Sequence, residues 1–114
     1  MIVHLKNARV WSPAELGIND LVIANGHFLH VGAPWTCSAP VTAVDLEGMH
    51  VVPGFIDQHI HITGAGGKDG YHSMTSELQA PELLLTGSTS VVGLLGTDGS
   101  ARSIHTLYSK AKAL

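Results

Sequence analysis

The stretch Val51 to Ile62, VVPGFIDQHIHI, decides how the rest of the chain is interpreted. It is predicted as a strand, punctuated by Pro53-Gly54 near its start and carrying His59 and His61 near its far end. Because side chains alternate faces along a strand, the two histidines project from one face, about 7 Å apart along it. Two imidazoles so placed can converge on one metal ion, and Asp57, with the same parity, can orient a ligand without touching the metal. A strand that happens to carry two histidines is the alternative, since H-x-H alone is a weak signal.

Composition bounds the class of protein. The 114 residues suit one small domain, and a formal charge of -3 gives no reason to expect a nucleic-acid partner. Charged residues make up 13%, about half of the usual share of roughly 25%. Mean hydropathy is +0.24, although a small domain has much surface and should be more polar. The composition therefore suggests a piece of a larger body, whose apolar faces expect partners.

The single cysteine and the lack of a recognisable signal peptide or membrane-spanning run predict a cytoplasmic protein. Cys37 is the only cysteine, so no disulfide can form within the chain, which favours a reducing compartment. The N-terminus, MIVHLKNARVW, is polar where a signal peptide needs an apolar core. No apolar run reaches the roughly 18 residues of a membrane-spanning helix. We expect a soluble chain without a membrane partner.

The first fifty residues are predicted as an all-β module. Short strands are expected at 2–11, 21–24, 27–33 and 41–46, with loops at 12–19 and 34–40. Asn25-Gly26 between two apolar runs predicts a two-residue type I′ hairpin, and Glu47-Gly48 predicts a turn. The module's histidines lack ligand spacing and are predicted as ordinary surface or edge residues: His4, His27, His30 and His50.

The chain changes character at Pro53 and alternates strands with helices. Buried-type strands are expected at 55–62 and 88–95, helices at 75–85 and 104–114, and loops at 63–73 and 96–100. Thr75 is a candidate cap for the first helix, although Pro81 interrupts it, so that helix is kinked or begins there. The order predicts two successive units of a parallel α/β architecture.

A glycine-rich loop follows the H-x-H strand, with glycines at positions 64, 66, 67 and 70. A phosphate-binding loop is excluded, because Gly67-Lys68 is followed by Asp69 and the first glycine of that motif would fall on Ile62. Two interpretations stay open: a merely flexible loop, or a loop whose backbone N–H groups approach a substrate closely.

These motifs together resemble a known family. VVPGFIDQHIHITGAGG, TSEL, TSVVGLLGTDG and SKAKAL look like the N-terminal part of the isoaspartyl dipeptidases, which are β-aspartyl peptidases of the amidohydrolase superfamily. The resemblance covers Val51 to Leu114. PGFIDxHxH is shared across the superfamily, whereas the glycine loop and VVGLLGTD point to this family.

The resemblance implies an α/β fold in two parts. Residues 1–52 would be the N-terminal part of a small β-sandwich, and 53–114 the first two β/α units of a (β/α)8 metallo-hydrolase barrel. Because a complete barrel needs roughly 200 residues or more, the chain is expected to be a truncated N-terminal fragment. The intact protein would be a homo-oligomer.

The resemblance also implies site residues and a reaction. His59 and His61 would bind one zinc ion of a two-zinc site, and Gly66 and Thr97 would lie at the aspartyl end of an isoaspartyl dipeptide. A carboxylated lysine, two more histidines and a proton-shuttling aspartate would lie beyond Leu114, so no catalytic residue is expected in this chain. The reaction would be zinc-dependent hydrolysis of the β-aspartyl amide, with activated water attacking its carbonyl. The fragment alone is expected to be inactive.

Several positions depart from the family or stay ambiguous. Lys68 stands where the family has the glutamate that receives the substrate's amino group, so Lys68 would repel that group unless Asp69 substitutes. Met74 stands where an arginine is common. Arg102 aligns with a family arginine, and a surface role at a helix start is an equal alternative. His72 and His105 are not expected to bind zinc.

Two rival functions remain. One is another amidohydrolase, such as a dihydropyrimidinase-like ring-opening enzyme, against which the glycine loop and GLLGTD argue. The other is a non-catalytic remnant that folds poorly or only binds a partner.

Overall fold

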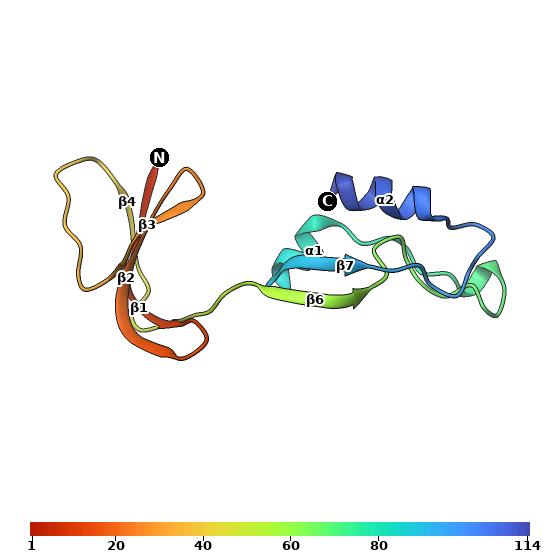
Figure 1. The fold of residues 1–114 in the computed structure, drawn as a ribbon, viewed down its shortest axis with the longest axis horizontal. Coiled ribbons are helices and arrows are strands. Elements are labelled where there is room, and N and C mark those ends of the chain that lie inside the picture. The colour runs from red at the N-terminus through yellow and green to blue at the C-terminus, as the bar shows by residue number, and fades with distance from the viewer. The chain divides into compact units, whose positions relative to one another are not determined.

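The computed structural model describes all 114 residues, which form two compact units, Met1–Pro53 and Gly54–Leu114. Figure 1 shows strands alone in the first unit and strands with helices in the second. The chain is therefore mixed α/β, as predicted.

The first unit is one five-stranded sheet. Its strands are β1 (Ile2–Trp11), β2 (Glu15–Ala24), β3 (His27–Gly32), β4 (Thr42–Asp45) and β5 (His50–Val51). They run in the order β3-β2-β1-β4, and β5 also pairs with β1. β1, β2 and β3 are antiparallel, whereas β4 and β5 run parallel to β1. A single sheet is not yet a sandwich, so the predicted β-sandwich stays a prediction.

The turns of this sheet both confirm and correct the sequence predictions. Asn25 and Gly26 have φ of 51° and 76° and join β2 to β3, so the type I′ hairpin is confirmed. The prediction of a loop over 12–19 is wrong from Glu15 onward. Gly17, with φ 82°, pairs with Val10 beside a register shift, so it forms a bulge within the strand and does not end it.

The core of the first unit contains a polar pair that the sequence did not indicate. Ala8, Val10 and Leu21 form the apolar cluster. Beside them His4 is only 5% exposed, and its Nε2 lies 2.7 Å from Oδ2 of the buried Asp20. The prediction that His4 is a surface or edge residue is therefore wrong: a buried carboxylate satisfies its ring nitrogen.

The second unit follows the predicted β-α-β-α order. Its elements are β6 (Phe55–Ile60), the 3-10 helix η1 (Tyr71–Ser73), α1 (Ala80–Leu85), β7 (Ser88–Gly93) and α2 (Ile104–Ala113). β6 and β7 pair in parallel, as expected for one β-α-β unit. None of the helices is long and apolar enough to cross a membrane.

The first helix is shorter than predicted. It begins at Ala80, because Gln79 and Glu82 form a reciprocal capping box and Pro81 occupies the first turn, where no N–H partner is needed. Thr75 is therefore not the cap. Ser103 caps α2 by accepting the N–H of Thr106.

The two strands of the second unit are less buried than their apolar sequences predicted. Phe55 is 59% and Ile56 is 66% exposed, and Val92 on β7 is also exposed. α1 packs against β7, and the Leu107 side chain of α2 lies near Gly93 at the end of the same strand. The prediction of strands buried on both faces is wrong for these 114 residues, because no element covers the outer side chains of β6.

Candidate active site

The two histidines of H-x-H lie at the carboxyl end of β6. His59 belongs to the strand and His61 follows its last residue, Ile60. Their ring centroids are 5.4 Å apart and the rings are nearly perpendicular, at 85°. The two imidazoles are therefore neighbours at the end of a parallel strand.

A hydrogen bond from the neighbouring strand fixes the orientation of His61. Its Nδ1–H donates to the carbonyl oxygen of Leu94, just beyond β7, at 3.0 Å. The carbonyl can only accept, so Nδ1 carries the proton and Nε2 keeps a free lone pair. A backbone carbonyl in this position is the usual outer partner of a metal-binding histidine.

Asp57 acts on the backbone and does not reach either ring nitrogen. Its Oδ1 accepts the backbone N–H of His59 at 3.0 Å. The hypothesis that Asp57 orients a metal ligand is therefore supported only indirectly, through the main chain that carries His59.

The donors suit a metal ion such as zinc but do not complete its shell. Imidazole is a favourable zinc ligand, and His61 presents the correct tautomer. No group of three or more histidine, cysteine, aspartate or glutamate side chains is placed to hold a metal in this chain. His72 and His105 do not join the pair, so the two imidazoles would supply only half of a tetrahedral zinc shell.

The glycine loop packs closely on the segment that follows it. The carbonyl oxygen of Gly66 accepts the hydroxyl of Thr97 at 3.1 Å. A Cβ on Gly66, whose φ is 77°, would lie 2.1 Å from the carbonyl oxygen of Ser73. Ser73 also accepts the N–H of Gly67 at its Oγ, at 3.1 Å. These contacts fix the conformation of the loop, so the interpretation as a merely flexible loop is not supported.

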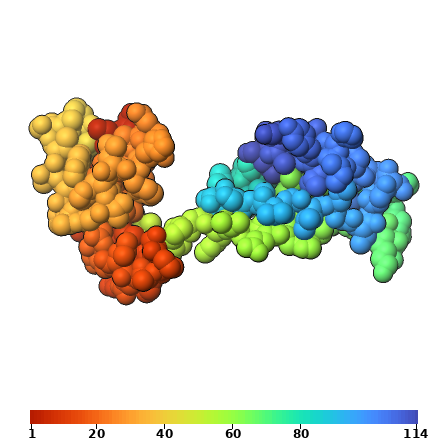
Figure 2. All heavy atoms as spheres, in the orientation of Figure 1, coloured from red at the N-terminus to blue at the C-terminus, as the bar shows by residue number.

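Lys68 and Asp69 lie at the exposed tip of the loop. Neither side chain forms an ion pair or a hydrogen bond within the chain. Figure 2 shows the segment around residue 70 projecting from the body of its unit. Both side chains are therefore free to turn in solvent.

Arg102 and Asp98 support the glycine loop, a role that the sequence did not predict for either residue. Arg102 is 8% exposed and donates to main-chain carbonyls of the loop region, so the surface interpretation is wrong. The Asp98 carboxylate accepts the N–H groups of Ser100 and Ala101, which lower its pKa with help from the Arg102 charge and against the effect of burial. The signal for Asp98 was the T-D-G-S turn, in which aspartate binds the amides that follow it.

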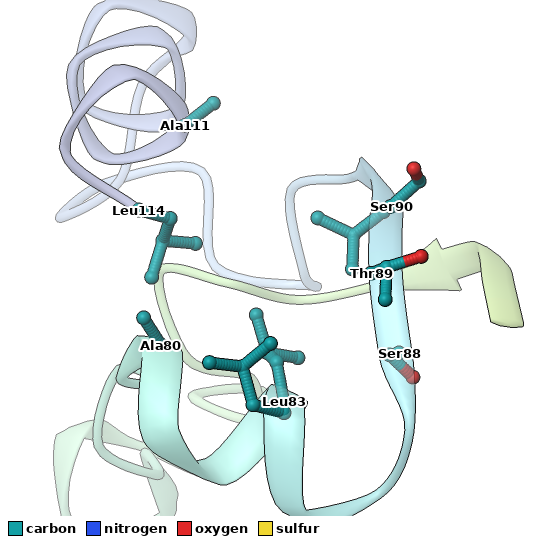
Figure 3. A pocket seen from close by; sticks show the side chains of 9 residues that line it. Ala80, Leu83, Ser88, Thr89, Ser90, Ala111 and Leu114 are labelled. Carbon is teal, nitrogen blue, oxygen red and sulfur yellow. The ribbon is translucent and has the colours of Figure 1, made fainter. Parts of the chain in front are cut away.

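A separate pocket of about 400 Å³ lies where the helices meet β7. Figure 3 shows Ala80 and Leu83 from α1, Ser88, Thr89 and Ser90 from β7, Ala111 from α2 and Leu114 just after that helix around it. It contains none of the candidate ligands or loop residues, so we do not assign the chemistry to it.

Solved structures of β-aspartyl dipeptidase resemble the whole chain. A crystal structure of this enzyme from Fervidobacterium islandicum AW-1 is 40% identical over 99% of the chain, with a TM-score of 0.88. A second, in complex with the β-Asp-Leu dipeptide, is 41% identical over 100% of it, with a TM-score of 0.87. The chain spans 31% and 30% of those two proteins. The predicted resemblance to this family is confirmed.

Curated relatives match parts of the chain. A dihydroorotase from Trichlorobacter lovleyi is 37% identical over 69 residues, and one from Citrifermentans bemidjiense is 33% identical over 93 residues. These matches cover 58% and 79% of this chain but only 16% and 19% of the relatives. No protein-family model matches the chain. Both kinds of relative are hydrolases of the amidohydrolase superfamily.

Proposed function

We propose that this segment supplies two metal ligands and the aspartyl-end loop of a metal-dependent β-aspartyl dipeptidase. The observation that carries the proposal is the arrangement at the ends of two adjacent parallel strands. There His59 and His61 lie beside each other after β6, and Thr97, after β7, binds the Gly66 carbonyl. Active sites of parallel α/β folds form at this end of the strands. The resemblance to β-aspartyl dipeptidase over the whole chain supports the same assignment.

Each residue has a defined task in this proposal. His59 and His61 hold a zinc ion, with His61 oriented by the Leu94 carbonyl. A bound divalent metal supplies activation of water and polarisation of an amide carbonyl. Gly66 and Thr97 shape the wall against which the aspartyl end of a β-aspartyl dipeptide binds, and Lys68 lies at the exposed tip of that wall.

The remaining groups of the reaction would come from the rest of such an enzyme. A second metal site, a bridging lysine and the aspartate that moves the proton are not formed by these residues. The barrel continuation, the homo-oligomer and the cytoplasmic location stay predictions.

A chimera tests the proposal. The 114 residues replace the equivalent segment of the Fervidobacterium islandicum enzyme, and zinc content and hydrolysis of β-Asp-Leu are measured. We expect zinc-dependent hydrolysis, lost together with zinc in His59→Ala. The matched control is His72→Ala, which changes an exposed histidine of the same unit outside the site and should leave both quantities unchanged.

A second candidate is the ring opening or closure carried out by dihydroorotases, and the curated matches favour it. We prefer the dipeptidase because its resemblance extends over the whole chain at higher identity. Turnover of dihydroorotate and not of β-Asp-Leu by the chimera would reverse this preference. A folded, zinc-loaded chimera without either activity would indicate the non-catalytic alternative.

A further inference from the structure

We infer that Arg102 is a positioning residue that holds the glycine loop in the shape required for substrate. This inference rests on the proposed function and adds to it a residue that contacts neither metal nor substrate. Arg102 directly precedes Ser103, the cap of α2, and its side chain turns back beneath the loop. Arginine is rarely buried unless its charge and N–H groups have partners, so the burial of this guanidinium calls for a structural explanation.

The guanidinium joins three separate pieces of main chain. Its Nε–H donates to the Thr63 carbonyl at 2.9 Å, and Nη2–H donates to the carbonyls of Ala65 and Thr75, each at 3.2 Å. Thr63 lies two residues after His61, and Ala65 directly precedes Gly66 in the glycine loop. Thr75 lies beyond the loop, in the segment that follows η1. The planar guanidinium therefore connects the end of the β6 segment, the glycine loop and the segment after η1.

The packing around Arg102 leaves little freedom for another arrangement. A Cβ on Gly64 would lie 2.9 Å from Nη2 of Arg102 and 2.3 Å from the Thr75 carbonyl oxygen. Asp98 approaches Nη1 only to 4.0 Å, and Nη1 has no hydrogen-bond partner. The carboxylate thus balances the charge, whereas the hydrogen bonds go to the loop carbonyls.

The loop bonds that Arg102 supports lead directly to the candidate site. The Ala65 N–H donates to Oγ1 of Thr75 at 2.8 Å, and the Thr75 N–H donates to the Ala65 carbonyl at 2.9 Å. The next residue, Gly66, accepts the Thr97 hydroxyl. Loss of the guanidinium would leave three carbonyls without this donor, and the Gly66 carbonyl would shift away from Thr97.

Amide hydrogen exchange of the 114-residue chain tests the inference without any need for activity. Three variants are compared: Arg102→Met, Arg102→Lys and the control Lys110→Met. Lys110 lies on α2 and pairs with Glu77 at 3.3 Å, so the control removes another link of the same helix. We expect Arg102→Met to speed exchange at Ala65, Gly67 and Thr75 by about tenfold or more. Arg102→Lys should give a smaller effect, because one ammonium cannot reach all three carbonyls.

The pattern of exchange distinguishes a local role from a general loss of stability. Amides of β6, β7 and α2 should keep their wild-type rates in Arg102→Met, as should all amides of the first unit. Unchanged exchange at Ala65 and Gly67, or acceleration spread evenly over the second unit, would overturn the inference. The control should leave the loop amides unchanged.

Kinetics of the chimera provide the second readout. For β-Asp-Leu we expect Arg102→Met to raise KM about tenfold, with kcat within about threefold and zinc content unchanged, because binding and not chemistry is affected. Equal loss of kcat and zinc would show that the metal site, and not the loop, depends on Arg102. If the unmodified chimera does not hydrolyse β-Asp-Leu, the proposed function fails, while the exchange experiment still decides the role of Arg102.

Discussion

The hydroxyl of Thr97 donates a hydrogen bond to the carbonyl oxygen of Gly66 across 31 positions of sequence, at 3.1 Å. Thr97 follows β7 and Gly66 follows β6, so this bond joins the loops at the same end of two neighbouring parallel strands. A carbonyl that accepts from Thr97 is fixed in direction, and so is the N–H of Gly67, which lies in the same peptide plane. The bond therefore connects two residues that we assign to the same substrate wall.

Removal of the Thr97 hydroxyl should weaken substrate binding. In the chimera we expect Thr97→Val to lower kcat/KM for β-Asp-Leu by up to about tenfold, the equivalent of a hydrogen bond worth roughly 0.5–1.5 kcal/mol. Thr97→Ser keeps the hydroxyl and serves as the control. Equal activity of Thr97→Val and the unmodified chimera in steady-state assays would show that the bond is not needed.

Local patterns predicted much of this fold because they act over a few residues. Asn25-Gly26 specifies its hairpin through positive φ, and the alternation of strands and helices after Pro53 specifies parallel pairing. Alternation along the strand also predicted that His59 and His61 would be neighbours, which their 5.4 Å ring separation agrees with.

The sequence patterns did not predict contacts between residues that are distant in the chain. His4 meets Asp20 over 16 positions, and Arg102 meets Thr63 over 39. Neither pair has a characteristic spacing, because tertiary packing sets such distances. The apolar run of the first barrel-type strand predicted burial that Phe55 and Ile56 do not have, whereas their exposure agrees with the unpartnered apolar faces that the composition suggested.

The His59 and His61 pair should bind zinc weakly in the 114-residue chain. Two imidazoles form half of a tetrahedral shell, and water must fill the other positions. Removal of both rings should weaken binding by at least the 10–100-fold typical of losing an outer partner. Calorimetric titration of His59→Ala/His61→Ala against the double control His72→Ala/His105→Ala tests this. Equal affinity in both variants would assign the metal to other histidines.

The first unit should lose stability in acid through Asp20. Burial raises the pKa of Asp20, but hydrogen bonds from the Trp35 amide, His4 and the Asn7 amide outweigh it, so the pKa lies below 3.8. A lowered pKa in the folded state means that the ionised carboxylate stabilises the fold above pH 3.8 and that this contribution disappears as the pH falls below it. Asp20→Asn should therefore be less stable at pH 6, by roughly 1–3 kcal/mol, and should respond less to acid.

Tryptophan fluorescence isolates the unit concerned, because Trp11 and Trp35 are the only tryptophans and both lie in Met1–Pro53. Urea unfolding followed by this signal at pH 6 and pH 3 provides the free energies. Asp98→Asn, in the other unit, is the control and should not alter the transition. Asp45, whose pKa is lowered by the Asn7 side chain, would account for the acid response that persists in Asp20→Asn. An identical pH dependence in Asp20→Asn and the unmodified chain would contradict the prediction.

Lys68 should limit the activity of the completed chimera. The resemblance implies a carboxylate at this position to receive the substrate's ammonium group, whereas Lys68 presents a like charge. Two like charges about 4 Å apart cost roughly 4 kcal/mol at an effective dielectric of 20. Lys68 is exposed and unpaired, so its head can turn to solvent while its stem stays in place. We therefore expect Lys68→Glu to raise kcat/KM for β-Asp-Leu by about tenfold, or 1.4 kcal/mol, and not by the full Coulomb figure.

Asp69 is the competing receiver of the ammonium group, and a double-mutant cycle separates the two positions. If Lys68→Glu supplies the missing carboxylate, Asp69→Ala should have little effect in its presence, because the ammonium already has a partner. Lys68→Gln is the matched control: it removes the repulsion without adding attraction and should give an intermediate kcat/KM. If Lys68→Glu leaves kcat/KM unchanged while Asp69→Ala abolishes it, Asp69 receives the ammonium group and the role assigned to position 68 is wrong.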